Sequence, residues 1–61
     1  MKRHYIVYAL TKYDAVCRYG AVCADEELHA LLRRKNIKAY KRISVDGEEA
    51  PGWREAEWIT V

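Results

Sequence analysis

Four side chains that could bind a metal ion are Cys17, Cys23, His4 and His29. Two thiolates and two imidazoles are enough for a tetrahedral zinc site. If residues 15–23 form one strand, however, six steps of ~3.3 Å put the two cysteines about 20 Å apart, too far for one zinc ion or a disulfide. The C-x-x-C spacing is also missing, and free cysteine is usually buried. The sequence therefore predicts two inward-pointing core cysteines, with a disulfide or a metal site as the less favoured alternatives.

Catalysis would need a nucleophile, a base and a cavity that encloses a substrate. Either cysteine could act as a nucleophile with His29 as its base, but no third residue is placed to orient such a pair. His29 lies one turn after Asp25 and one turn before Arg33, which predicts a surface position on a helix. A chain this short leaves too little interior to enclose a substrate. We therefore expect a protein that is not an enzyme and uses no cofactor.

The densest charge lies between Arg33 and Arg42, where six of ten residues are cations. A helix end and the strand after it could present these cations to phosphates, with Tyr40 as a stacking face. The alternative is a solvated face, because cations are favoured at a helix C-terminus and on exposed edge strands. No known nucleic-acid-binding signature accompanies the stretch. The residues of this nucleic-acid alternative are Arg33, Arg34, Lys35, Lys38, Lys41 and Arg42.

Acidic residues and tryptophans follow the basic stretch. The carboxylates between Asp46 and Glu57 could dock a basic region of a partner or of a second copy, although ordinary solubilising charge is favoured. Trp53 and Trp58 are five residues apart, hence on opposite faces of a regular strand. We expect Trp58 in the core and Trp53 on the surface, where tryptophan is typical of interfaces. The protein-binding residues expected from the sequence are Trp53, Tyr40, Glu48 and Glu49.

Two strands are predicted in the first third of the chain. The run from Tyr5 to Leu10 is apolar on both faces and rich in β-branched and aromatic residues, which is typical of a central strand. Residues 15–23 alternate as a second strand, linked to the first by a hairpin. Gly20 could end that pairing early, because glycine in a strand often marks a bulge.

A helix and two further strands are predicted after residue 24. Asp25 is expected to be the helix N-cap and Asn36 its left-handed stop. The apolar stripe of this segment consists of Ala24, Leu28, Leu31 and Leu32. Residues 38–45 alternate as a strand with one wetter face, and Asp46 and Gly47 open a turn. A last strand is expected over residues 53–61.

The expected fold is α+β, a single small domain with an antiparallel sheet of three to four strands packed on one helix. The element order is β-β-α-β-β, or β-α-β-β if Gly20 breaks the second strand. The 61 residues are 51% hydrophobic with a net charge of +2, which excludes a disordered tail, and no run approaches the ~20 apolar residues of a membrane span. With no signal peptide in view, we expect one domain over residues 1–61, cytoplasmic and without a membrane partner.

These features together favour a small protein-binding module that docks through an exposed aromatic or sheet edge and segregated charges. The alternatives are the nucleic-acid-binding module described above and a structural subunit of a homo-oligomer. A homodimer formed by edge-strand pairing is compatible with so thin a core. In size and element order alone, the chain is similar to the small accessory proteins with which phages bind host enzymes. That resemblance implies modulation of a host factor by surface docking.

Overall fold

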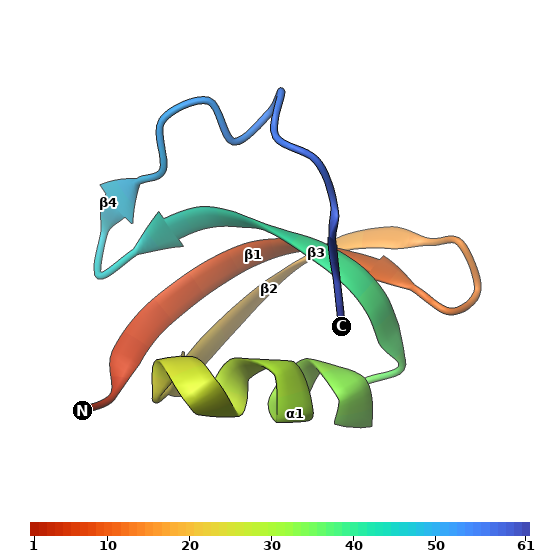
Figure 1. Cartoon of the computed structure of the whole chain (residues 1–61), viewed down its shortest axis with the longest axis horizontal. Helices are drawn as coiled ribbons and strands as arrows, with labels where there is room; N and C mark the ends of the chain where they lie inside the picture. Colours follow the sequence, from red (N-terminus) through yellow and green to blue (C-terminus); the bar gives the residue numbers. More distant parts are fainter.

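One antiparallel sheet with a helix across one of its faces makes up the computed structural model, which describes residues 1–61 (Figure 1). The strands are β1 (Arg3–Thr11), β2 (Val16–Cys23), β3 (Ile37–Val45), β4 (Glu48–Glu49) and β5 (Ile59–Thr60). A 3₁₀ turn, η1 (Asp25–Glu27), and the helix α1 (Leu28–Arg34) connect β2 to β3. The strand order is β2-β1-β3-β4, and β5 also pairs with β3. The predicted α+β fold is confirmed, with one more short strand than expected.

β1 is the central strand, as its two apolar faces predicted. It pairs with β2 along one edge and with β3 along the other. Tyr5, Val7 and Ala9 point toward α1 and are at most 2% exposed, so we call this side the helix face. The opposite side, which carries Tyr8, is the outer face. Leu28 and Leu32 of α1 are fully buried against the helix face and complete the core.

β2 runs unbroken through Gly20, which pairs with Ile6. The order that begins β-β-α is therefore confirmed. Cys17 and Cys23 are both free thiols on the helix face, but only Cys23 is buried. The prediction that both point into the core is wrong for Cys17, because α1 covers only the Cys23 end of this strand.

The helical segment begins one residue earlier than predicted. Ala24 occupies the cap position, and the Glu27 carboxylate accepts a hydrogen bond from its backbone N–H at 3.2 Å. Asp25 is therefore not the N-cap, and its carboxylate instead accepts hydrogen bonds from the sheet, from the Tyr5 hydroxyl and the Arg42 guanidinium. Asn36 ends the segment with a φ of 60°, the left-handed conformation that the sequence predicts.

β3 departs from simple alternation at two points. Its register with β1 shifts twice, and Lys38 and Ile43 are the extra residues. An added residue reverses the face to which the following side chains point. Tyr40 therefore lies opposite Ala9 on the helix face and is 1% exposed. Its predicted place on a wetter face, open to a partner, is wrong.

The C-terminal segment crosses the outer face instead of forming the predicted strand over 53–61. Asp46 and Gly47, with φ of 52° and 84°, make the two-residue turn into β4. Residues 51–56 form turns, and only Ile59–Thr60 pairs with β3. Figure 1 shows most of this segment on the side of the sheet opposite α1, while the chain end descends past β3 toward the helix side, where Val61 packs against the core. No helix in the chain has the length and apolar content needed to span a bilayer.

Candidate functional site: the free edge of β2 and its groove

β2 leaves one complete strand edge without a partner. It is the terminal strand of the sheet and pairs only with β1. The other side of the sheet is less open, because β4 and β5 both pair with the outer edge of β3. An unpaired edge presents a row of backbone N–H and C=O groups to solvent. These groups can pair with a strand from another chain.

The usual protection of an edge strand is almost absent from β2. Its eight residues include one charged side chain, Arg18, and no proline. The register with β1 runs without a bulge from Cys23 to Val16. Both valines of the strand are open to solvent, Val16 at 46% and Val22 at 66%. Natural edges are commonly blocked by charge, proline or a bulge, so this one is suited to strand pairing.

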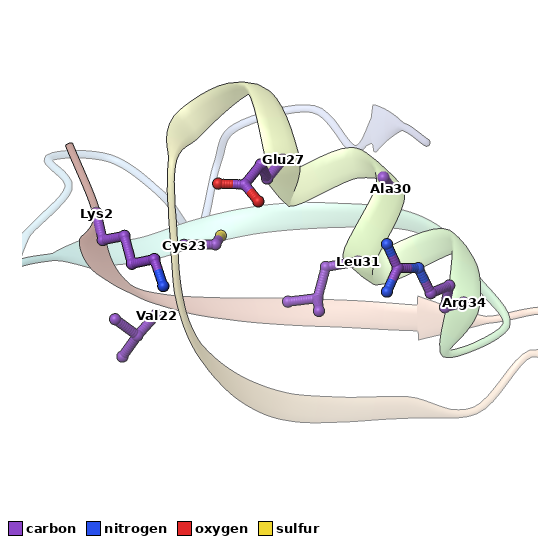
Figure 2. A pocket seen from close by; sticks show the side chains of 7 residues that line it. All are labelled: Lys2, Val22, Cys23, Glu27, Ala30, Leu31 and Arg34. Carbon is purple, nitrogen blue, oxygen red and sulfur yellow. The ribbon is translucent and has the colours of Figure 1, made fainter.

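A groove lies beside the Cys23 end of β2, between the strand and α1 (Figure 2). Its cavity is about 190 Å³, below the ~300–1,000 Å³ that is typical of small-molecule sites. In Figure 2, Lys2 and Arg34 lie toward opposite ends of the groove and Leu31 lies between them. The lining consists of Lys2, Val22, Cys23, Glu27, Ala30, Leu31 and Arg34. A space of this size suits one side chain of a partner.

The Cys23 thiol of this groove is not paired with a histidine base. Burial raises the pKa of the Cys23 thiol, and the nearby carboxylates of Glu27 and Asp25 raise it further. A thiol with a raised pKa is protonated at neutral pH and is a poor nucleophile. His29 is engaged elsewhere, since its Nε2 is hydrogen-bonded to the Tyr40 hydroxyl. No group of three His, Cys, Asp or Glu side chains is placed to hold a metal ion.

The predicted basic stretch is divided among separate surfaces. Arg33, Arg34 and Lys35 are exposed at the C-terminal end of α1. Lys41 lies on the outer face, with its Nζ 5.0 Å from the centroid of the Trp58 ring. The remaining two cations, in β3, form ion pairs with carboxylates. The structure therefore does not bring the six cations into one patch.

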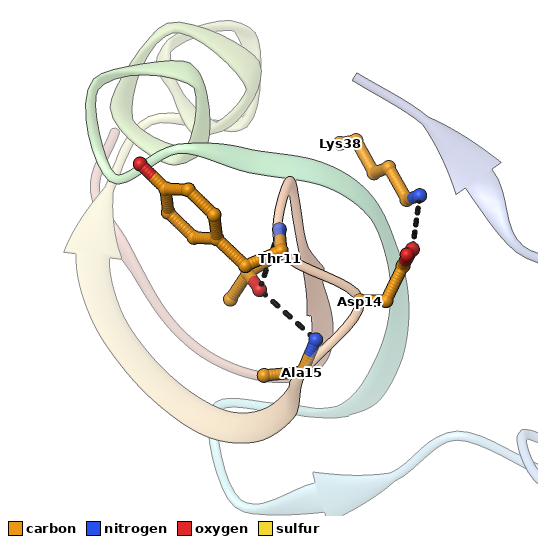
Figure 3. Close-up of polar contacts among 5 residues, drawn as sticks. Thr11, Asp14, Ala15 and Lys38 are labelled. Atoms are coloured by element: carbon orange, nitrogen blue, oxygen red, sulfur yellow. Dashed lines mark hydrogen bonds and ion pairs between the residues drawn. The ribbon is translucent and has the colours of Figure 1, made fainter.

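The first of these ion pairs ties β3 to the turn between β1 and β2. Lys38 Nζ donates to Asp14 Oδ1 at 2.6 Å (Figure 3). In the same turn, Thr11 Oγ1 accepts hydrogen bonds from the backbone N–H groups of Tyr13 and Ala15. The Lys38 ammonium holds the pKa of the Asp14 carboxyl below its usual value, first by this hydrogen bond and then by its charge.

The second ion pair lies on the helix face. Arg42 Nη2 donates to Asp25 Oδ1 at 2.7 Å, and its guanidinium lies over the Tyr5 ring, 5.5 Å from the centroid. These residues, together with Arg3 and Val45, line a second, more open hollow of about 300 Å³. The Arg42 charge is thus engaged within the fold.

The four residues predicted to bind a protein are also dispersed. Tyr40 is buried under α1, and Glu48 and Glu49 are exposed on β4, on the side of β3 away from β2. Trp53 is half-buried on the outer face, where its ring meets Tyr8 edge-on at 5.9 Å. They therefore do not share one surface.

The expected burial of the two tryptophans is wrong. Trp58 is 38% exposed, and its ring stacks on Tyr8 with centroids 6.1 Å apart. Trp53 is the less exposed of the two, although it was expected on the surface. The five-residue spacing failed as a guide because the segment between them is not a regular strand.

The sequence indicated a sheet edge but not the residues of the groove. The exposure of Val16 and Val22 could have been predicted. Both fall on the face of the predicted strand that is opposite to its cysteines, which were expected to point into the core. Lys2 and Arg34 carried no such signal, because only the fold brings the N-terminal residues and the last turn of α1 to the same groove. Comparisons with protein-family models, curated proteins and solved structures found no match for this chain.

Proposed function

We propose that this chain is a non-enzymatic protein-binding module that takes up an extended segment of a partner as an additional strand on β2. The observation that carries the proposal is the complete, almost uncharged free edge of this strand. In binding by strand addition, main-chain hydrogen bonds supply affinity, and pockets for alternate side chains supply specificity. The groove beside β2 offers one such pocket. Docking of this kind would act sterically on the partner, as the resemblance to phage accessory proteins implies.

The other expected surfaces have less support. Trp53 already uses its ring against Tyr8 and beneath the Arg54 guanidinium. The basic residues do not form the continuous positive track that nucleic acid follows, and Tyr40 cannot stack on a base while it is buried. A second copy of the chain could compete for the same edge, and the experiment below distinguishes such a dimer from binding of a partner segment.

The experiment is a selection from a displayed library of linear peptides, followed by amide-shift mapping on the isotope-labelled protein. The expected result is that selected peptides shift the amides of β2 and slow their hydrogen exchange. Each peptide is also made in two N-methylated series, on odd or on even residues. Because alternate amides of an added strand point toward its neighbour, one series should lose binding and the other should retain it.

Three results would contradict strand addition on β2. One is an absence of binding peptides, and another is equal binding by the two N-methylated series. The third is a set of shifts that centres on Trp53 and Trp58 or on the basic residues of α1. Sedimentation of the protein without peptide tests whether a second copy of the chain occupies the β2 edge. A dimer that forms without peptide and protects the β2 amides would assign the edge to a second copy.

A further inference from the structure

We infer that the segment bound by β2 carries an aliphatic side chain flanked by carboxylates. This inference rests on the proposed function and names the chemistry of the partner. The aliphatic side chain would enter the groove between β2 and α1, and the carboxylates would face Lys2 and Arg34. The occupant is thus an acidic, extended stretch of another protein.

The size and lining of the groove favour an aliphatic side chain. Neighbouring strands lie ~4.8 Å apart and point alternate side chains to each face, so a strand added to β2 would turn every second side chain to the helix face, and one of these would lie over the groove. The apolar residues that line the groove are Val22, Cys23, Ala30 and Leu31. Val22 borders it at the strand edge, with its side chain toward the outer face, whereas Leu31 is partly buried on the helix face. Leu31 would therefore lose apolar exposed area when a partner side chain fills the 190 Å³.

The charges around the groove favour an acidic partner. The two ion pairs of the fold use Lys38 and Arg42, so the charges of Lys2 and Arg34 have no carboxylate partner. Glu27 is the one carboxylate in the lining, and it accepts a hydrogen bond from the Ala24 N–H. Two cations therefore face one anion around an apolar floor. Carboxylates on the partner would complete this arrangement.

The same charges argue against a second copy of β2 as the occupant. The sequence of β2, VCRYGAVC, contains an arginine and no carboxylate. An antiparallel copy of this strand could not neutralise Lys2 or Arg34, because its one charged side chain is Arg18. Strand addition by a different, acidic chain would supply the carboxylates that a second β2 lacks.

The test compares charge-reversal variants in peptide binding. The selected peptides are expected to be enriched in Asp or Glu on both sides of Val, Ile or Leu. In the double variant Lys2→Glu with Arg34→Glu, affinity for these peptides should fall about tenfold or more, and peptides with lysine in place of the acids should bind better. The matched control is Arg33→Glu with Lys35→Glu, which changes the net charge equally but alters residues outside the groove. Its effect should be less than about threefold.

A second variant tests the apolar part of the inference. Ala30→Leu places a larger side chain in the groove and should weaken binding about tenfold, while the contrast between the two N-methylated series remains. Circular dichroism of each variant checks that the fold is retained, and Ala30 and both charged pairs are exposed.

Two outcomes separate the inference from the proposed function. If peptides add to β2 but show no acidic preference, or if the control pair weakens binding as much as the groove pair, the inference is overturned and the proposed function stands. If no peptide reaches β2, the proposed function itself fails.

Discussion

His29 and Tyr40 join the helix to the sheet through one hydrogen bond, 2.9 Å between the imidazole Nε2 and the phenol oxygen. Their rings also meet edge-on, with centroids 5.4 Å apart and planes at 82°. Tyr40 is 1% exposed, so little water can replace this partner. His29, which the sequence placed on the helix surface, is thus half-buried and part of the packing between α1 and β3.

Tyr40→Phe should lower the free energy of unfolding by about 1 kcal/mol, because it removes one internal hydrogen bond and leaves the ring in place. Urea unfolding followed by circular dichroism measures the change. Tyr13→Phe is the control, since Tyr13 is 80% exposed and its hydroxyl forms no hydrogen bond within the protein. Equal stability of the Tyr40→Phe variant and the wild-type protein would show that this bond contributes nothing.

Two glycines should respond in opposite ways to alanine. Gly47 has a φ of +84° and no heavy atom within 4 Å of an added Cβ, so Gly47→Ala should destabilise by roughly 1–2 kcal/mol through backbone strain alone. At Gly20 an added Cβ would lie 3.8 Å from His4 Nε2, an ordinary contact, without a left-handed φ. Gly20→Ala should therefore be neutral or stabilise by about 0.4–1 kcal/mol, because alanine restricts the unfolded chain. Destabilisation by both substitutions in urea unfolding would contradict this account.

The elements that the sequence predicts correctly are those set by local patterns. Each of these patterns determines local structure through residues that are close together in the sequence. They are the run of β1 that is apolar on both faces, the leucine stripe of α1, and the turn residues Asn36 and Gly47. The two bulges of β3 are different in kind, because they depend on how this strand pairs with β1. A period-2 pattern cannot show an added residue, so Tyr40 was assigned to the wrong face.

The candidate site was only partly predictable for a similar reason. The sequence indicated an exposed sheet edge, but which strand lies at the edge is decided by long-range pairing. The basic stretch looked continuous because its residues are neighbours along the chain. Successive residues of a strand point to opposite faces, which separates Lys41 from Arg42. The C-terminal tryptophans were misassigned because a regular strand was assumed where the chain turns.

The Asp14 and Lys38 ion pair should make part of the stability depend on pH at the acid end. The hydrogen bond from Lys38 lowers the pKa of Asp14 in the folded state. A carboxyl whose pKa is lowered on folding contributes its full stabilisation of the folded state at pH values above its unfolded-state pKa of about 3.9. This contribution is lost as the pH falls through the pKa of the folded state. Lys38→Gln should therefore destabilise the protein at neutral pH, and the difference from wild type should vanish in acid.

Carbon-detected NMR titration of the Asp14 carboxyl provides the direct measurement. Its pKa should lie below the ordinary aspartate value in wild type and rise in Lys38→Gln. Lys35→Gln is the control, because Lys35 is exposed and lies in neither ion pair of the protein. An Asp14 pKa that is the same with and without Lys38 would rule out this coupling.

Asp25 should couple the central strand to the first turn of the helical segment. Its Oδ1 accepts hydrogen bonds from the Tyr5 hydroxyl at 3.0 Å and from Arg42 Nη2 at 2.7 Å. Asp25→Ala leaves the buried Tyr5 hydroxyl without this acceptor, whereas Tyr5→Phe removes the donor. In a double-mutant cycle, Tyr5→Phe should therefore lower the midpoint of thermal unfolding less in the Asp25→Ala background than in wild type.

The titration of Tyr5 tests the same contact independently. Burial raises the pKa of the Tyr5 phenol, and the hydrogen bond to Asp25 and its negative charge raise it further. Asp25→Ala should lower that pKa toward the ordinary tyrosine value without reaching it, because burial remains. Glu26→Ala is the control, since it removes an exposed carboxylate from the same turn. Additive effects in the cycle, together with an unchanged Tyr5 titration, would show that Asp25 does not link the turn to β1.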